Sequence, residues 1–295
     1  MYAVRQHPPG GLAGLVYEEI ETPEPGQGEA LIEVHAAAIT RGELGWTSDR
    51  LPATPSFELS GVVAAVGPDV EDVAVGGPVY GLADFDREGA AAEYAVVRSE
   101  FLGAKPQSIG HVESAALPLA GLSAWQGLFE HGGLTKGQRV LVQGAAGGVG
   151  HFAVQLARHR GAYVIGATSA GSNESVRELG ADEVVTAIPD RFEPVDLVFD
   201  TVGGERLEHA PAVVRPGGRL VSIADEPPEA AGISSTYFVV GPNREQLVEL
   251  AKLVDGGTLH PTIDAVFPLS ESRKAFERTM GDRRGGKIVL QVVNE

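Results

Sequence analysis

Residues 139–160 read RVLVQGAAGGVGHFAVQLARHR, a short apolar run, a glycine-rich turn and an amphipathic stretch with helical spacing. A strand, such a turn and a helix in succession are the local context of a dinucleotide-binding site. Gly147 lets the backbone approach a pyrophosphate, Gly150 lets the helix pack close against the strand, and the first helical N–H groups face the phosphates. Ala145 stands where the usual first glycine of this fingerprint would be. The alternative is a plain tight turn, but both flanking elements favour a bound dinucleotide.

The chain on either side of this segment alternates in the same way. Apolar runs lie at residues 139–143, 163–167, 195–200, 219–224 and 236–240, and helix-like stretches lie between them at 149–160, 174–179, 204–214 and 244–255. The runs are too apolar for strands with one face in water. Such alternation predicts an α/β fold with a doubly wound parallel sheet of the Rossmann type.

The two ends of the chain differ from this middle part. Roughly the first third shows short β-rich runs broken by turn residues, as in ETPEPGQGE at residues 21–29. After residue 255, strand-like runs at 262–267 and 287–293 flank a helical stretch at 269–280. We therefore expect a β-rich catalytic domain at residues 1–115, completed by residues 256–295, and a Rossmann domain at residues 116–255.

The composition argues against several classes of protein. The 295 residues include 23 Lys and Arg against 40 Asp and Glu, and the resulting net charge of -17 disfavours nucleic acids and anionic membranes as partners. There is no cysteine, which excludes disulfides, thiolate catalysis and cysteine-ligated zinc. The start MYAVRQHPPGG lacks the layout of a signal peptide. A cytoplasmic protein is expected.

The loop after the second Rossmann strand bears on the choice of cofactor. An Asp or Glu about 20 residues beyond the glycine-rich turn would accept from the ribose 2′-OH of NAD. Here YVIGA is followed by Thr168, Ser169 and Ser172, and the first acidic residue is Glu174. No carboxylate is placed to repel a 2′-phosphate, so the loop favours NADPH. A polar loop that only caps the next helix would contain the same residues.

Nine segments spread over the whole chain carry a family resemblance. They read YEEIETPEPGQGEALIEVHAAAIT, LSGVVAAVGPDV, GAAAEYAVV, AALPLAGLSAWQGLF, GAAGGVGHFAVQLA, RELGADEVV, DLVFDTVGG, RPGGRLVSI and RGGKIVLQV. Together they resemble the medium-chain dehydrogenase/reductase superfamily, specifically its zinc-independent NADPH:quinone oxidoreductase branch. The resemblance implies a GroES-like catalytic domain, a Rossmann domain and NADPH in the cleft between them. It also implies a homodimer paired through an edge strand of the Rossmann sheet, at residues 235–240.

The positions of the zinc ligands bear on the reaction. Zinc members of this superfamily use a cysteine and a His-Glu pair, but here Ile39 and Thr40 stand where the cysteine would fall, and Phe57 precedes Glu58 where the histidine would. None of the eight histidines has the HExxH spacing. The resemblance thus implies no zinc and no other metal. Hydride transfer without a Lewis acid suits a quinone or enone better than an alcohol.

The resemblance also implies the residues that contact the cofactor. They come from the glycine-rich turn, the ends of the Rossmann strands and the tail, and they are Ser123, Ala146, Gly147, Gly148, Val149, Thr168, Ser169, Val202, Ser222, Ile223, Ala224, Phe238, Arg284 and Lys287. The segment 273–287 holds six basic residues against two acidic ones. We predict that Arg284 and Lys287 in this segment meet the cofactor's phosphates.

The expected reaction is hydride transfer to a quinone-type acceptor. Thr40 is placed to hydrogen-bond the substrate or a cofactor ribose, and Tyr237 is a candidate proton donor, with water as the other source. Trp46 and Glu58 are candidates for the substrate pocket, against loop packing for Trp46 and an ion pair with an arginine such as Arg41 for Glu58. Two other functions stay open. One is reduction of enoyl or alkenal substrates, and the other is a sensor that binds NADPH with little catalysis.

Overall fold

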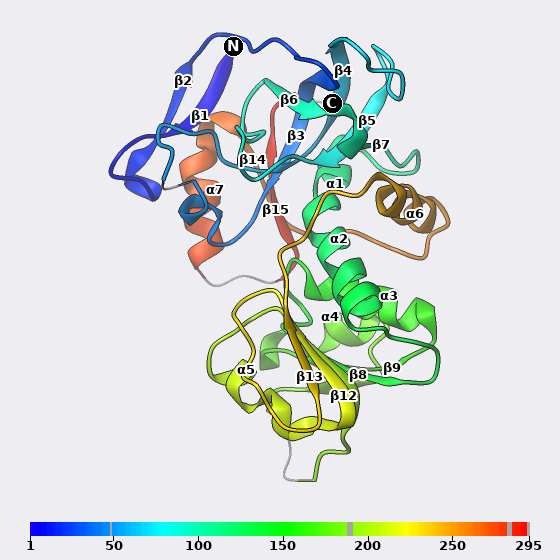
Figure 1. Cartoon of the computed structure of the whole chain (residues 1–295). Coiled ribbons are helices and arrows are strands. Elements are labelled where there is room, and N and C mark those ends of the chain that lie inside the picture. The colour runs from blue at the N-terminus through cyan, green and yellow to red at the C-terminus, as the bar shows by residue number, and fades with distance from the viewer. Residues whose placement is uncertain (48, 188–190, 282–284, 294–295) are drawn as a thin grey trace.

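The computed structural model describes residues 1–47, 49–187, 191–281 and 285–293. Figure 1 shows two lobes, the upper one built from both ends of the chain and the lower one from its middle. The α/β fold class with a Rossmann sheet and a β-rich second lobe is confirmed. Within the described residues, no helix is at once long enough and apolar enough to cross a membrane.

The lower lobe is built on a six-stranded parallel sheet. Its strands lie in the order β10 (Glu183–Val185), β9 (Tyr163–Ala167), β8 (Arg139–Gln143), β11 (Val195–Asp200), β12 (Val214–Ser222) and β13 (Ser234–Tyr237). The chain adds strands outward from β8 in one direction and then from β11 in the other. Ligands of such sheets bind beyond the carboxyl ends of the two central strands, where this order reverses.

Alternate residues of these strands are buried on opposite faces of the sheet. Val140 and Val142 belong to the core shared with α2 (Pro118–Trp125), α3 (Gly150–Arg160) and α6 (Arg244–Asp255). Leu141 between them packs on the other face with Leu207 of α5 (Glu205–His209). The short α4 (Asn173–Glu178) joins β9 to β10. Burial on both faces explains why the strands read as continuous apolar runs.

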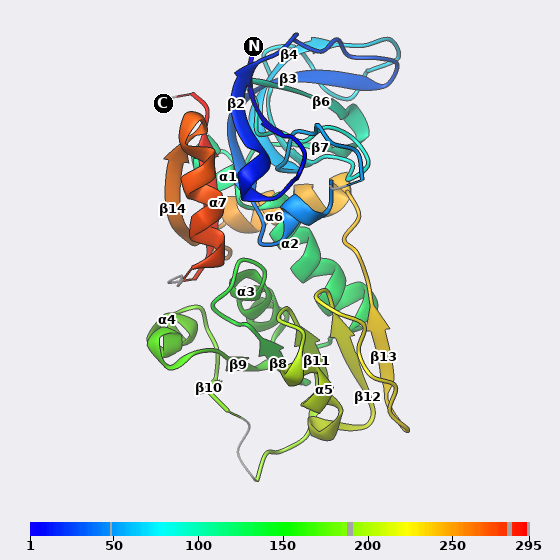
Figure 2. The ribbon, with the colours of Figure 1, turned by 90° about the vertical axis from the view of Figure 1, so that its left-hand side faces the viewer.

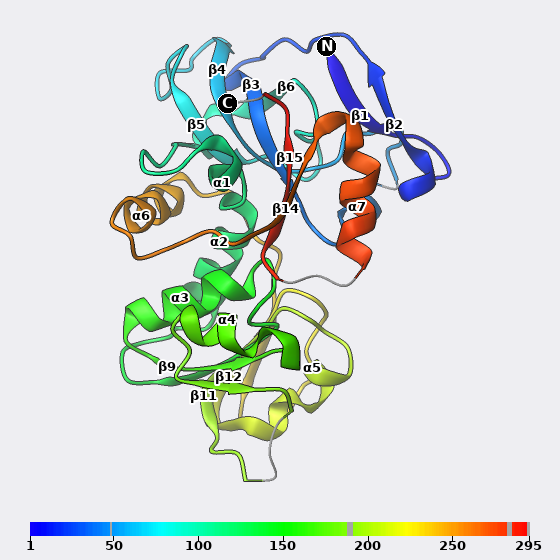
Figure 3. The same cartoon turned by 180° about the vertical axis from the view of Figure 1, so that it is seen from behind.

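The upper lobe contains a seven-stranded sheet. Its path is β14 (Ile263–Pro268), β15 (Lys287–Gln291), β3 (Glu29–Ile39), β4 (Glu58–Val66), β5 (Pro78–Leu82) and β7 (Leu102–Ala104), with β6 (Tyr94–Arg98) paired to β3. A hairpin of β1 (Tyr2–Gln6) and β2 (Leu15–Glu19), the short α1 (His111–Ala115) and α7 (Ser272–Met280) complete it. The C-terminal strands thus join the N-terminal sheet, as Figure 3 shows from behind.

Some elements differ from the sequence-based expectation. The helix expected over residues 204–214 ends at His209 and continues as a 3₁₀ turn, Ala210–Val213, because Pro211 has no N–H to donate in a helix interior. Strand β10 was not expected. The strand expected at 219–224 begins at Val214, and the one expected at 236–240 is Ser234–Tyr237. The division of the chain at residue 115 stays a prediction.

The lobes meet through side chains at α6. The Tyr80 hydroxyl of β5 donates to the carbonyl of Leu247, and the Arg244 guanidinium donates to the carbonyl of Leu102 at 2.6 Å and pairs with Asp72 at 2.5 Å. Tyr80 also belongs to the same hydrophobic core as Leu250 of α6. Figure 2 shows α2 and α6 between the two sheets. The core therefore runs without a break from one lobe into the other.

Candidate active site

A cleft of about 1060 Å³ lies between the lobes, at the carboxyl ends of β8 and β11. Most residues that the sequence assigned to the site line it: Thr40, Trp46, Ser123, Ala146, Gly147, Gly148, Val149, Thr168, Ser169, Val202, Ile223, Ala224, Tyr237, Phe238 and Lys287. Ser222 and Glu58 are not among the lining residues and are buried behind them. Arg284 lies outside the described residues. The contacts of these residues with a ligand stay predictions.

The glycine-rich turn is shaped by two close backbone approaches. Gly144 has φ +77°, and a Cβ there would lie 2.5 Å from the Thr201 hydroxyl. A Cβ at Gly150 would lie 2.0 Å from the carbonyl oxygen of Gly144. Only glycine fits either position, because real Cβ contacts do not approach so closely. Helix α3 begins at Gly150 with no side chain capping it. The N–H groups of His151, Phe152 and Ala153 already donate to the carbonyls of Gly147 and Val149, so an anion in the cleft would meet the N–H groups of the turn and of Gly150 itself.

His151, one residue further on, ties this turn to the tail. Its Nε2 accepts from the backbone N–H of Thr262 at 3.1 Å, so its Nδ1 carries the proton and donates to the carbonyl of Gly147 at 2.9 Å. Burial lowers the pKa of His151 to about 4. The neutral ring therefore holds the turn in place. A second tie is the bond from the Gly286 N–H to the Ala146 carbonyl, at 2.9 Å.

Asp200 at the end of β11 shapes the next loop. Its buried carboxylate accepts from the Ser222 hydroxyl at 2.9 Å and from the N–H groups of Gly203 and Val202 at 3.0 and 3.2 Å. Burial raises its pKa. Ser222 was expected to face the cofactor, but its side chain is used here to hold Asp200 and the loop that follows β12. The lining residues Ile223 and Ala224 come directly after it.

A buried polar cluster lies at the upper-lobe end of the cleft. The Lys287 ammonium contacts a Glu58 carboxylate oxygen and donates to the Thr40 hydroxyl at 3.0 Å. The other Glu58 oxygen accepts from the N–H of Leu119 at 3.0 Å. Burial raises the pKa of Glu58, although the Lys287 charge opposes that rise. The cation paired with Glu58 is thus Lys287, and not Arg41.

Glu43 adds a second carboxyl group to this cluster. One of its oxygens accepts from the backbone N–H of Thr40 at 3.0 Å, and the other has no hydrogen-bond partner among the described residues. Burial raises the pKa of Glu43 to about 8. Its carboxyl group is therefore neutral at pH 7, in contact with the ion pair of Lys287 and Glu58.

The charge along the cleft is opposite to that of the whole chain. Arg41, Arg206 and Lys287 line it, and none of the described lining residues is an Asp or a Glu. This contrasts with a net charge of -17. Arg206 lines the cleft together with the hydroxyl residues Thr168, Ser169 and Ser172. The sequence did not single out Arg206; its place on α5, just after the loop at the end of β11, is the signal that could have found it.

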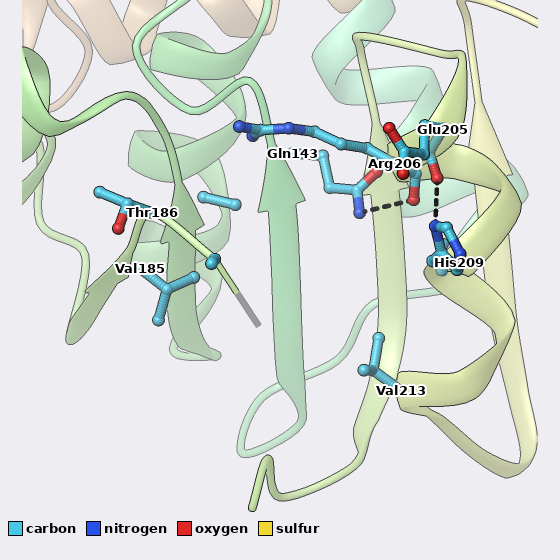
Figure 4. A pocket seen from close by; sticks show the side chains of 10 residues that line it. Gln143, Val185, Thr186, Glu205, Arg206, His209 and Val213 are labelled. Carbon is cyan, nitrogen blue, oxygen red and sulfur yellow. Dashed lines mark hydrogen bonds between the residues drawn. The ribbon is translucent and has the colours of Figure 1, made fainter. Parts of the chain in front are cut away.

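A smaller pocket of about 250 Å³ opens beside the Arg206 end of the cleft. Figure 4 shows its walls: the ends of the first Rossmann strands on one side and α5 on the other, with the Arg206 side chain extending toward the end of β8. The Gln143 amide nitrogen donates to the Arg206 carbonyl at 3.3 Å. The Gln143 amide oxygen is buried and has no partner among the described residues.

Aromatic rings form the outer wall of the upper-lobe end. Trp46 lies 5.4 Å from Phe85 and 6.0 Å from Phe57 between ring centroids. Phe57 is fully buried, whereas Trp46 is 42% exposed and faces the cleft. Tyr237 and Val239, which end and follow β13, line the same cleft and are exposed. These flat apolar surfaces suit a planar substrate.

Metal ligands are sparse in this region. Ile39, Thr40 and Phe57 stand at the positions that the family resemblance assigns to zinc ligands. In the part of the chain that the structure describes, no group of three or more His, Asp or Glu side chains is arranged to hold a metal ion.

Comparison with known proteins agrees with this architecture. The family model described as an alcohol dehydrogenase GroES-like domain matches residues 26–107, and the one described as a zinc-binding dehydrogenase matches residues 179–290. A probable zinc-binding oxidoreductase, mitochondrial, of Arthroderma benhamiae is 31% identical over 99% of this chain and 96% of its own. An NADPH-dependent alkenal/one oxidoreductase, chloroplastic, of Arabidopsis thaliana is 33% identical over 95% of this chain and 77% of its own. The quinone oxidoreductase structure from Coxiella burnetii has a TM-score of 0.90 and 29% identity and covers 99% of both chains.

A Rossmann sheet and a GroES-like lobe with a cleft between them define a two-lobed oxidoreductase. The chain belongs to the medium-chain dehydrogenase/reductase superfamily. This confirms the family resemblance of the sequence.

Proposed function

We propose that this protein is an NADPH-dependent, zinc-independent reductase of quinone-type acceptors. The observation that supports this most strongly is the charge of the cleft, which is lined by three cations and no carboxylate among its described residues. A cleft of this kind in a strongly acidic protein is suited to an anionic ligand. The acceptor end is walled by aromatic rings and lacks a cluster of metal ligands in the described residues.

The residues of the cleft fit NADPH along its length. The N–H groups of the glycine-rich turn and of Gly150 at the start of α3 would hold the pyrophosphate. Arg206 with Ser169 would bind a 2′-phosphate. The sequence also assigned Lys287 and Arg284 to the phosphates. In the structure the Lys287 ammonium is already engaged by Glu58 and Thr40.

The chain's part in the reaction is to bind, orient and exclude water. NADPH, when bound, supplies the hydride. Ser123, Tyr237 and Phe238 line the cleft between the turn and the acceptor wall, where they would hold two planar partners against each other. Thr40 supplies a hydroxyl at the acceptor end. No residue needs to form a covalent bond with the substrate.

The second candidate acceptor is an α,β-unsaturated carbonyl compound, and the relative from Arabidopsis thaliana, an alkenal/one oxidoreductase by name, favours it. A turnover panel separates the two. NADPH consumption would be followed with 1,4-benzoquinones and with alkenals and enones of similar size. Turnover of quinones at higher kcat/KM supports the first proposal, and activity on enones alone would replace it. NADPH binding without consumption on either set would instead indicate the sensor.

We also propose a homodimer in the cytoplasm. Strand β13 lies at the end of the Rossmann sheet and pairs only with β12 within the described residues, so its outer edge can accept the same strand of a second copy. Light scattering after size exclusion should give twice the chain mass of 30.8 kDa. A monomer at micromolar concentration would contradict the dimer. Fractionation of the source cells tests the location.

A further inference from the structure

The Lys287 ammonium is the most deeply buried cation that lines the cleft, with 3% of the residue exposed. The charged and titratable groups around it are Glu58, Glu43 and His151. Glu58 forms a buried ion pair with Lys287, while Glu43 and His151 are neutral at pH 7 because burial raises the pKa of one to about 8 and lowers that of the other to about 4. The Lys287 ammonium therefore pairs with one carboxyl group, that of Glu58, and donates a further hydrogen bond to Thr40.

The direction of the hydrogen bonds leaves the Thr40 proton available. An ammonium can only donate, so the Thr40 oxygen accepts from Lys287 at 3.0 Å. The Thr40 hydroxyl must then donate elsewhere, and the nearest described acceptor, a Glu58 oxygen, lies 3.5 Å away. That distance is well beyond the usual 2.7–2.8 Å for such a bond. Since Thr40 lines the cleft, the oxygen of a bound carbonyl substrate would be a better acceptor.

We propose that Thr40 and Lys287 form a proton-delivery pair for the acceptor oxygen. This inference rests on the proposed function. Thr40 is the catalytic residue that touches the substrate, and Lys287 is the positioning residue that resupplies its proton. The pair is an alternative to a contact between Lys287 and the cofactor's phosphates.

The step balances in atoms and electrons. As a C–H bond forms with the hydride, the π electrons of the acceptor move onto its carbonyl oxygen. That oxygen takes the hydroxyl proton of Thr40, and the Thr40 oxygen takes a proton from Lys287 Nζ. Lys287 is left as an amine and regains its proton from water once product leaves. A quinone first gives a hydroxydienone, whose hydride-bearing ring carbon loses a proton while its second carbonyl oxygen gains one, so that a hydroquinone results. An enone becomes an enol that tautomerises to the saturated carbonyl compound.

Two variants test the pair without leaving a charge unpaired. Thr40→Val removes only the hydroxyl. Lys287→Met alone would strand the buried Glu58 carboxylate, so it is combined with Glu58→Gln. Both variants should bind NADPH within about twofold of wild type, and kcat should fall about 100-fold, the usual scale for loss of a general acid. Lys287→Arg with Glu58 intact keeps the positive charge but cannot release a proton, so its kcat should stay low.

The ability of the site to stabilise a bound oxyanion can be measured without turnover, from the pKa of a phenol bound in the cleft. 4-Nitrophenol absorbs visible light only as its anion, and its titration would be followed in the complex with NADP⁺, with its binding established by competition. In wild type, the hydrogen bond from Thr40, backed by Lys287, should lower the pKa of the bound phenol by about one unit, as a hydrogen bond to the charged form does. Both variants should lose the shift, because Thr40→Val removes the donor and the other variant removes the cation behind it. An unshifted phenol in wild type would overturn the proposal.

The results separate the inference from the proposed function. No NADPH consumption by wild type with any acceptor contradicts the proposed function, while the phenol titration still tests the pair. Normal kcat in both variants overturns the pair alone. A tenfold rise in the NADPH dissociation constant of the Lys287→Met/Glu58→Gln variant, with an unshifted phenol, would assign Lys287 to the phosphates instead.

Discussion

His151 makes the stability of the protein sensitive to acid. Its pKa is about 4 in the fold and 6.5 when unfolded, so between these values only the unfolded chain binds the proton. The free energy of unfolding therefore falls as the pH is lowered from 6.5 to 4, by roughly 3 kcal/mol. His151→Gln, which can keep both hydrogen bonds, should lose this part of the dependence in urea titrations at several pH values. His159→Gln, at an exposed position, should follow wild type, and identical curves for all three proteins would contradict the assignment.

Glu43 acts in the opposite direction. Its pKa is about 8 in the fold against 4.5 unfolded, so the native state holds a proton that the unfolded chain releases. The free energy of unfolding should fall by several kcal/mol as the pH rises through this window. Glu43→Gln should gain stability relative to wild type between pH 5 and pH 9, measured by denaturant titration. Glu19→Gln, on the exposed side of β2, is the control, and a constant difference for Glu43→Gln across the range would refute the buried neutral carboxyl.

Arg206 should decide between the two nicotinamide cofactors. It lines the cleft together with the hydroxyl residues Thr168, Ser169 and Ser172, which the proposed function assigns to the adenosine ribose and its 2′-phosphate in NADPH. Arg206→Gln should raise the NADPH dissociation constant about tenfold, or about 1.4 kcal/mol, and leave that of NADH nearly unchanged, by fluorescence titration. Lys252→Gln on the exposed side of α6 is the charge-matched control. Equal losses for both cofactors would place the 2′-phosphate elsewhere.

Contacts between residues close in the sequence were easier to predict than contacts between residues that are far apart in the sequence. The need for glycine in the glycine-rich turn is explained by residues within the turn, because Gly150 packs against the carbonyl of Gly144. The partner of Glu58 could not be found in this way, because Lys287 reaches it only through the sheet that joins both ends of the chain. Ser222 was expected to face the cofactor from the end of its strand, but its hydroxyl donates a hydrogen bond to Asp200 instead.

At the scale of elements, the β8–turn–α3 unit depends on the absence of a Cβ at Gly150. Gly150→Ala would place a methyl group 2.0 Å from the Gly144 carbonyl oxygen, so the turn must open. The variant should lose NADPH binding and about 2–4 kcal/mol of stability. Gly241→Ala, whose added Cβ meets nothing within 4 Å, should change the free energy of unfolding by less than about 1 kcal/mol. Wild-type NADPH affinity in Gly150→Ala would contradict the role of the turn.

Elements with a strong period were predictable, and short ones were not. The apolar runs of β8, β9 and β11 and the helix α3 stand close to their expected bounds. Strand β10 has only three residues and begins with Glu183, which gives no apolar run to detect. The start of β12 at Val214 was hidden by Arg215, Pro216 and two glycines, which read as a turn but continue the strand.

At the scale of the whole molecule, the shared core should make the lobes unfold together. Tyr80→Phe removes the buried bond to the Leu247 carbonyl and should cost about 1–3 kcal/mol. Circular dichroism and calorimetry should still report one transition, at lower temperature. Tyr163→Phe, which loses an exposed bond to Glu183, should cost less than about 0.5 kcal/mol. Two separate transitions in wild type would show that the lobes are independent.

The overall architecture followed from the sequence because alternation of strands and helices allows few topologies. The return of the tail to the first sheet was also expected. The sequence did not predict the individual contacts between the lobes, such as the ion pair of Arg244 with Asp72. These contacts depend on how the two lobes pack against each other once both are folded.

The position of β15 sets an order of events during synthesis on the ribosome. Residues 36–39 of β3 pair with residues 288–291 of β15, so this stretch of β3 leaves the exit tunnel long before its partner is translated. All six strands of the Rossmann sheet lie between them in the sequence, so that sheet can form first. Until β15 is translated, the edge of β3 that it will pair with stays unpaired in the first lobe. That edge consists of Ala36, Ala37, Ala38 and Ile39. Because three of these four side chains are small, the unpaired edge exposes little apolar surface. A nascent chain is therefore poorly able to associate through it with another chain that is being translated from the same mRNA.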